Sequence, residues 1–103
     1  MRSTPQPRFD SVPVMITVKH SQGDEWEVTV QSGATTRHRV RVTTSELNQY
    51  GGGATAESLL QESFRFLLER EPNTAILRSF DLSVINSYFP DYEQEIRRRL
   101  RTG

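Results

Sequence analysis

The chain has 103 residues, with 13 Lys and Arg against 13 Asp and Glu and no cysteine, so its formal net charge at neutral pH is zero. This length suits one domain, since compact domains usually hold about 100–150 residues. The lack of cysteine excludes disulfide scaffolds, thiolate metal sites and cysteine nucleophiles. No apolar run approaches the ~20 residues of a membrane-spanning helix, and the first eleven residues lack a signal peptide's apolar core. We therefore expect a cytoplasmic protein.

The N-terminal segment, residues 1–11, contains two prolines and two arginines. Beyond the initial methionine, Phe9 is its single large apolar residue. Such a segment cannot bury enough apolar surface to offset the entropy lost on ordering it. We predict a flexible tail over residues 1–11 and a single domain over residues 12–103.

Three segments alternate apolar and polar residues with period 2, which is typical of strands with one buried and one solvated face. The apolar positions are Val12, Val14, Ile16 and Val18, then Trp26, Val28 and Val30, then Val40 and Val42. Short loops connect the three segments. The pattern therefore predicts a three-stranded antiparallel meander.

The alternation also restricts how the strands pair, because a slip of one residue moves every side chain to the other face. A three-residue loop over residues 21–23 pairs Val18 with Trp26 and places Gly23 where a left-handed residue is needed. Lys19 then lies opposite Glu25, as a cross-strand pair of opposite charge.

The second loop, near Gly33, allows two registers. Val28 lies opposite Val40 in one register and opposite His38 in the other. Both preserve the alternation. The sequence therefore leaves open which arginine of the third strand faces Glu27.

Helical signals begin at Thr43. Thr43 and Glu46 have the spacing of a capping box, and the glycines at 51–53 end this first helix within two turns. Thr55 caps a second helix, which runs to residue 71 before Pro72 stops it. The apolar stripe of this helix comprises Ala56, Leu59, Leu60, Phe64, Leu67 and Leu68.

Three further helical segments are expected in the remainder of the chain. Asn73 caps the first, Asp81 opens the second, and Pro90 suits the first position of the last. The last helix is acidic at its start and basic at its end, which matches the helix dipole. The predicted fold class is α+β, a three-stranded antiparallel meander followed by and packed against three to four helices.

A basic strand is the first candidate site. Arg37, Arg39 and Arg41 alternate on the solvated face, where a row of guanidinium groups can bind phosphates or base edges. The alternative is that these arginines pair with Glu25 and Glu27 and keep the face soluble, which is the more common role of such residues.

Two other features are candidate anion-binding sites. The C-terminal RRRLR run is basic, but arginines at a helix end mainly stabilise the helix. The Gly51–Gly53 loop precedes a helix N-terminus, but it lacks the lysine and the spacing of a nucleotide-binding loop. We interpret the first as a stabilised helix end and the second as a linker that stops a helix.

Nothing in the sequence organises a catalytic site. His20 is placed at a turn and His38 on the inner face of its strand, and neither has a partner at metal-ligand spacing. The carboxylates are spread over exposed helix faces. No nucleophile, base and orienting group come together, so the sequence predicts no catalytic residue, no metal and no cofactor.

Aromatic residues are the remaining candidates. Phe66 lies off the apolar stripe of its helix, which indicates a second contact, either with later helices or with a partner. Tyr88 and Tyr92 belong to an aromatic-rich ending, and aromatic residues with a polar end are enriched at interfaces. Phe66, Tyr88 and Tyr92 are the predicted protein-interaction residues.

Residues 37–71, which read RHRVRVTTSEL and continue through the Thr55 helix, resemble a ribbon-helix-helix repressor. In that family the outward residues of the strand read DNA, and here they correspond to Arg37, Arg39 and Arg41. The resemblance also implies that the amides near Thr55 hold a phosphate. Unlike that family, this chain has two strands ahead of the ribbon and a first helix broken by three glycines.

A wider likeness covers residues 12–100. The runs EREP at 69–72, FDL at 80–82 and YFP at 88–90 resemble a family of short uncharacterised bacterial proteins. The resemblance implies a bacterial, cytoplasmic, stand-alone domain, and it carries no activity, cofactor or catalytic residue with it.

The function we expect is therefore a small non-catalytic module that binds another protein or itself, through the aromatic surface or an open sheet edge. Nucleic-acid binding by the face of Arg37, Arg39 and Arg41, as in a repressor or antitoxin, is the alternative. An enzyme of unknown class is the least favoured of the three. No membrane partner is expected.

Overall fold

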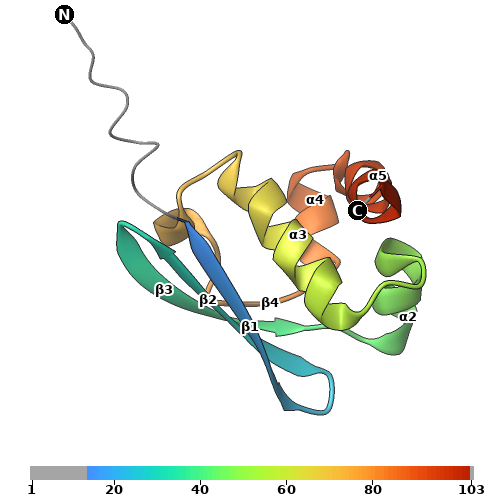
Figure 1. The fold of residues 1–103 in the computed structure, drawn as a ribbon, viewed down its shortest axis with the longest axis horizontal. Helices are drawn as coiled ribbons and strands as arrows, with labels where there is room; N and C mark the ends of the chain where they lie inside the picture. The colour runs from blue at the N-terminus through green and yellow to red at the C-terminus, as the bar shows by residue number, and fades with distance from the viewer. Residues whose placement is uncertain (1–13, 103) are drawn as a thin grey trace, which may run out of the picture.

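The computed structural model describes residues 14–102, so the predicted tail over residues 1–11 lies outside the described residues. Figure 1 shows a sheet with the helices gathered on one side of it. The α+β class is confirmed. The other side of the sheet carries no helix in the part of the chain that the structure describes.

The sheet has four strands in the order β1-β2-β3-β4, where a meander of three was predicted. β1 (Met15–Gln22), β2 (Glu25–Ser32) and β3 (Ala34–Arg41) are antiparallel, as expected. β4 (Ser79–Asp81) pairs with β3 in parallel. The prediction that Asp81 opens a helix was therefore wrong, because residues 79–81 extend along the free edge of β3 instead.

The first hairpin keeps the predicted faces but not the predicted register. Val18 lies opposite Val28 rather than Trp26, and Lys19 lies opposite Glu27 rather than Glu25. The strands continue closer to the turn than expected, and a bulge between residues 20 and 22 absorbs the odd residue. Gly23 adopts the left-handed conformation, with a φ of 52°, as predicted.

The second hairpin adopts one of the two registers that the alternation allowed. Val28 lies opposite His38, so that Glu27 faces Arg39 and Glu25 faces Arg41. Gly33 forms the turn, with a φ of 82°. This register decides which charges are neighbours on the solvated face of the sheet.

The described helices follow the predicted order. They are α2 (Thr44–Glu46), which continues into the π-helix η1 (Leu47–Gly51), α3 (Ala56–Leu68), the 3-10 helix η2 (Asn73–Ala75), α4 (Val84–Tyr88) and α5 (Tyr92–Thr102). The capping box of Thr43 and Glu46 is present. Thr55 caps α3 by accepting a hydrogen bond from the Ser58 amide at 3.1 Å.

Asn73 does not cap η2, contrary to the prediction. Its buried side-chain amide donates instead to the carbonyl of Ala34 at 3.0 Å and to the hydroxyl of Thr36 at 3.1 Å. Both acceptors belong to β3. These bonds fasten the chain after α3 to the start of that strand, and so bring it toward the sheet edge that β4 joins.

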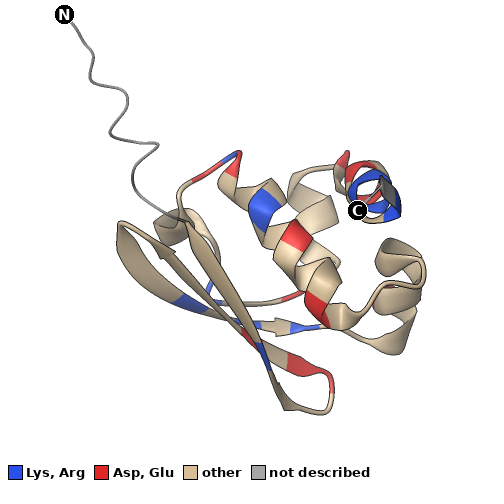
Figure 2. Cartoon of the chain, in the orientation of Figure 1, with Lys and Arg blue, Asp and Glu red and all other residues tan. Residues whose placement is uncertain are grey.

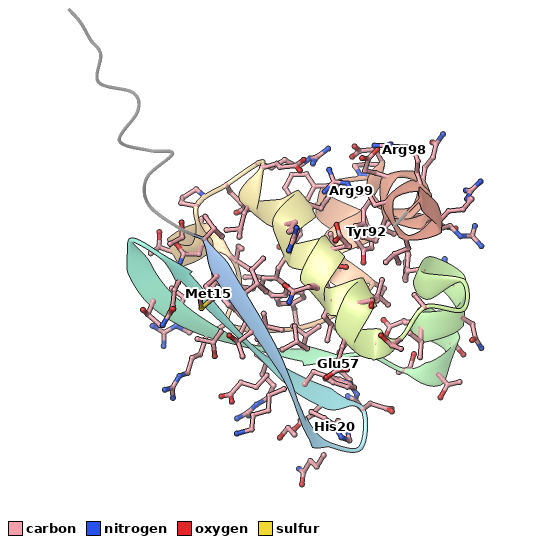
Figure 3. The ribbon with its side chains drawn as sticks, in the orientation of Figure 1. Met15, His20, Glu57, Tyr92, Arg98 and Arg99 are labelled. Carbon is pink, nitrogen blue, oxygen red and sulfur yellow. The ribbon has the colours of Figure 1, made fainter. Side chains whose placement is uncertain are left out.

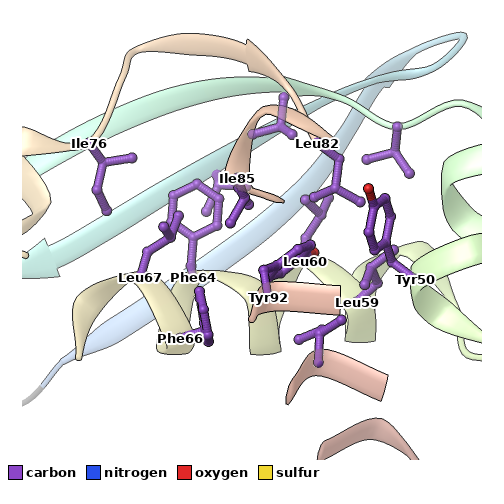
Figure 4. Packing of buried hydrophobic residues seen from close by; sticks show 14 of the residues in the cluster. Tyr50, Leu59, Leu60, Phe64, Phe66, Leu67, Ile76, Leu82, Ile85 and Tyr92 are labelled. Atoms are coloured by element: carbon purple, nitrogen blue, oxygen red, sulfur yellow. The ribbon is translucent and has the colours of Figure 1, made fainter. Parts of the chain in front are cut away.

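The core lies between the inner face of the sheet and α3, with α5 packed on the far side of α3. Val28, Val30 and Val40 come from the sheet and are fully buried. The predicted stripe of α3 faces them, and Figure 4 shows Leu59, Leu60 and Phe64 together with Tyr92 of α5 in this core. Burying a side chain of this size contributes about 1.5–3 kcal/mol.

Candidate interaction surfaces

Two of the three aromatic residues predicted to contact a partner lie in the core. Phe66 and Tyr92 are both 0% exposed, so neither reaches a partner. Phe66 packs edge-on against the ring of Tyr92, with 5.3 Å between the ring centroids. The Arg70 guanidinium lies over the Phe66 ring, 3.7 Å from its centroid. The second contact expected from the position of Phe66 is therefore made with α5.

The Tyr92 hydroxyl is satisfied within the core. Ser63 donates to the carbonyl of Leu59 at 2.6 Å, so the Tyr92 hydroxyl donates to the Ser63 oxygen, also at 2.6 Å. Burial raises the pKa of Tyr92 well above its usual range. This residue locks α5 to α3 and has no free polar end for a ligand.

Tyr88, the third predicted residue, is 66% exposed at the end of α4. It lines a cavity of about 210 Å³ between the end of α3, η2, β4 and α4, which we term the α4 groove. Its main apolar walls are Leu67, Ile76, Leu77, Phe80, Ile85 and Tyr88. Leu77 is also well exposed, at 47%.

Glu71 is the charged residue among those that line the α4 groove. It follows the end of α3 and forms no ion pair with another residue of the described chain, whereas Glu69 nearby contacts both Arg70 and Arg99. The groove therefore combines apolar walls with one carboxylate that has no ion-pair partner within residues 14–102. No sequence pattern indicated it, because its walls come from four separate elements.

The outer edge of β1 is one edge of the sheet, and an open sheet edge was one of the predicted docking surfaces. Gln61 of α3 donates to the carbonyl of Ile16 at 3.0 Å, so one of the groups along this edge already has a partner. The Gln61 side-chain oxygen is buried without a hydrogen-bond partner. Met15 lies exposed at the start of the same strand, as the label in Figure 3 shows.

The predicted arginine face is present. Arg37, Arg39 and Arg41 are exposed on the side of the sheet that faces away from the helices. Figure 2 shows basic residues along the strands of the sheet. Cross-strand register places Glu27 beside Arg39 and Glu25 beside Arg41. Neither pair comes within the 4.0 Å of an ion pair, so the predicted neutralisation by direct pairing is not found among the described residues.

The arginines of the helical layer behave differently. Ion pairs join Arg97 to Glu93 at 3.5 Å and Arg99 to Glu69 at 2.7 Å, and Arg98 contacts Glu95. Arg98 and Arg99 lie together on α5 in Figure 3. The C-terminal basic run is therefore largely engaged with its own helix, as expected, and the pKa of Glu95 is lowered by its bonds to Arg98 and Arg99.

The glycine loop and the end of α5 lie on either side of one open hollow. Gly51–Gly53, Arg97 and Arg101 line it. Gly52 adopts a φ of 56° and ends η1, as predicted for a residue that stops a helix. The glycine loop and the C-terminal basic run, which are far apart in the sequence, therefore line the same hollow.

Arg78 joins the arginine face although the sequence did not single it out. It directly precedes β4, and its carbonyl accepts a hydrogen bond from the Arg39 amide at 2.7 Å. Arg37, Arg39, Arg78 and Glu27 line one surface hollow, together with Ser79. Only the parallel pairing of β4 with β3 brings Arg78 to this position.

His38 lies beneath this cluster, 2% exposed, as its inner-face position predicted. Its Nδ1 donates to the carbonyl of Leu77 at 2.8 Å, since a carbonyl can only accept, and its Nε2 therefore accepts from the Thr36 hydroxyl at 2.8 Å. Burial lowers the pKa of His38, and the nearby positive charge of Arg78 lowers it further. The neutral ring holds the chain that carries Arg78 against β3.

No group of three or more potential ligands for a metal ion occurs among residues 14–102. In the same part of the chain, no helix is both long and apolar enough to cross a membrane. The chain matches no protein-family model, no curated protein and no solved structure.

The resemblance to ribbon-helix-helix repressors depended on a strand that is free to pair with a second copy. β3 is hydrogen-bonded to β2 on one edge and to β4 on the other. A ribbon shared between two copies over residues 37–41 would therefore have to displace β4, which pairs with residues 39–41. The outward direction of Arg37, Arg39 and Arg41 does not depend on such a ribbon.

Proposed function

We propose that this chain is a non-catalytic, cytoplasmic protein-binding module that uses the α4 groove. The observation that carries the proposal is the open apolar cavity beside two exposed large side chains, Leu77 and Tyr88. A tyrosine at the rim of an apolar pocket is typical of binding hot spots, because it buries a large area while its hydroxyl remains solvated.

The groove also favours one kind of occupant. Its volume of about 210 Å³ suits an anchor of one or two large apolar side chains. Glu71 lies in its lining without an ion-pair partner among the described residues. A peptide segment with an aromatic or aliphatic anchor next to Lys or Arg complements both properties.

A selection from a library of displayed peptides tests this proposal. We expect selected peptides to combine an apolar anchor with a nearby basic residue. Tyr88→Ala and Leu77→Ser should each weaken binding about 5-fold or more, as measured by fluorescence anisotropy. Glu71→Gln should weaken it about 2- to 5-fold, because exposed ion pairs contribute less than about 1 kcal/mol.

Met15→Ser is the matched control, since Met15 is an exposed apolar residue on β1, outside the groove. Its affinity for the selected peptides should equal that of the parent protein. Selected peptides that bind the three groove variants as tightly as the parent would contradict the proposal. Light scattering across concentration tells whether a second copy fills the groove, in which case Tyr88→Ala returns the protein to a monomer.

A further inference from the structure

The register of the sheet divides the arginine face into two unequal ends. Arg41 has a carboxylate neighbour on each side, with Glu25 opposite it on β2 and Asp81 opposite it on β4. Arg37 lies opposite Thr29, which is neutral. Positive charge is therefore balanced toward the end of β3 and uncompensated toward its start.

Arg78 adds to the uncompensated end. It lines the same hollow as Arg37 and Arg39, and it also lines the neighbouring hollow with Arg37. Neither Arg37 nor Arg78 has an ion-pair partner in the described chain. We term the three side chains of Arg37, Arg39 and Arg78 the Arg37 cluster.

This cluster is held by a rigid frame. β3 pairs with β2 along its whole length, and its residues 39–41 also pair with β4 on the other edge. The segment before β4 is fixed by the bond from Arg39 to the Arg78 carbonyl and by the bond from His38 to the Leu77 carbonyl. The guanidinium groups thus project from backbone that loses little freedom when a ligand binds.

We propose that the Arg37 cluster binds the phosphate backbone of duplex nucleic acid without reading its bases. Guanidinium groups bind phosphate oxygens in a bidentate manner. Alternate residues of an extended strand repeat at about 6.8 Å, so Arg37 and Arg39 can contact separate phosphates of a duplex, whose negative charges are closely spaced along its backbone. A rigid row therefore suits a rigid series of phosphates better than it suits a flexible acidic peptide, which loses entropy on binding.

The surroundings of the cluster point to backbone contact alone. The part of the sheet face that carries it presents hydroxyls and charges, including Thr29, Thr35 and Ser79, and no aromatic side chain on which a base stacks. Glu27 lines the same hollow and opposes a phosphate there. The binding is therefore weak, dependent on salt and limited by Glu27.

The test is a titration of a fluorescent 20-base-pair duplex by anisotropy between about 20 and 200 mM salt. We expect the logarithm of the affinity to fall with the logarithm of the salt concentration, with a slope of about −2 to −3 for two to three phosphate contacts. Arg37→Gln and Arg78→Gln should each reduce the slope by about 0.9. Glu27→Gln should raise the affinity, because it removes the opposing charge.

Arg101→Gln is the control, since Arg101 is exposed on α5 away from the sheet. It should leave the affinity and the slope unchanged. The proposal is overturned if the duplex does not bind at 20 mM salt, if Arg101→Gln acts like Arg37→Gln, or if Glu27→Gln has no effect. It is also overturned if polyglutamate binds as tightly and depends on the same arginines, which would indicate an acidic protein partner.

Discussion

At the scale of single residues, His38 connects parts of the chain that are far apart in sequence. Its ring joins β3 to the carbonyl of Leu77 and accepts from Thr36, whose hydroxyl oxygen also accepts from Asn73. A proton added at Nε2 removes the acceptor that the Thr36 hydroxyl uses. It also places a second positive charge near Arg78. The neutral ring is therefore part of the folded structure.

The stability of the protein should consequently fall as the medium becomes acidic. The pKa of His38 is lowered in the folded state from the ordinary value of 6.5. Above pH 6.5 the ring is mostly neutral in both the folded and the unfolded protein. Below that pH the unfolded chain binds the proton more readily than the folded protein, so acid favours unfolding. Denaturant unfolding between pH 7.5 and 5 should show a loss of stability that His38→Gln reduces.

His20→Gln is the control for that series. His20 is exposed near the end of β1, and its Nε2 donates to the Gly23 carbonyl at 2.8 Å. This variant should keep the pH dependence of the parent protein. An identical loss of stability in His38→Gln and the parent would show that other groups cause it.

Phe66 shows what a helical pattern reveals about one residue. Its position off the stripe of α3 correctly indicated a second contact, but no pattern within α3 tells whether α5 or another protein makes it. Tyr92 is similar, because its apolar repeat and its polar hydroxyl suit both a core and an interface. The Ser63 hydroxyl that satisfies it lies on α3 and is brought close only by the fold.

At the scale of elements, Glu46 joins the start of α2 to the start of α4. One of its carboxylate oxygens accepts from the Thr43 amide at 2.9 Å, and the other accepts from the Ser83 amide at 3.0 Å. The capping box was predicted from the spacing of Thr43 and Glu46 alone. The bond to Ser83 was not, since Ser83 follows the unexpected strand β4.

This double role predicts unequal costs of two substitutions. Thr43→Ala removes one side of the capping box and should lower the free energy of unfolding by about 1 kcal/mol. Glu46→Ala also leaves the Ser83 amide without its partner and should cost about 2 kcal/mol. Urea unfolding monitored by circular dichroism measures both values. A cost for Glu46→Ala no larger than that for Thr43→Ala would refute the role of the Ser83 bond.

The strand β4 was not predicted from the sequence. The first three strands were recognisable because each alternates over several residues. β4 has only Ser79, Phe80 and Asp81, and its single large apolar side chain fits a helix equally well. Arg78 and the walls of the α4 groove follow from the placement of this strand, so the Arg37 cluster was predictable in part and the groove was not.

At the scale of the whole molecule, the sheet is completed from two distant parts of the chain. The three hairpin-connected strands make contacts that are local in sequence. The bonds of β4, from Arg39 to the Arg78 carbonyl and from Leu82 to the Arg41 carbonyl, close the whole segment 42–78. Forming such a contact costs the entropy of closing a long loop.

We therefore predict that β4 joins the sheet late in folding. In a refolding experiment with pulsed hydrogen exchange, amides in the β1–β2 and β2–β3 ladders should gain protection before the Arg39 and Leu82 amides. Nuclear magnetic resonance reads each amide separately. Protection of the Leu82 amide together with, or ahead of, the two antiparallel ladders would show that the helical segment organises the sheet instead.

The parallel strand has a further consequence during synthesis, since a ribosome makes the chain from its N-terminus. β3 leaves the ribosome with one edge unpaired until residues 78–82 follow it. An unpaired edge is a template on which other nascent chains aggregate. Charged side chains along an edge disfavour that pairing. The arginines of β3 should therefore reduce aggregation of the nascent chain before β4 is made.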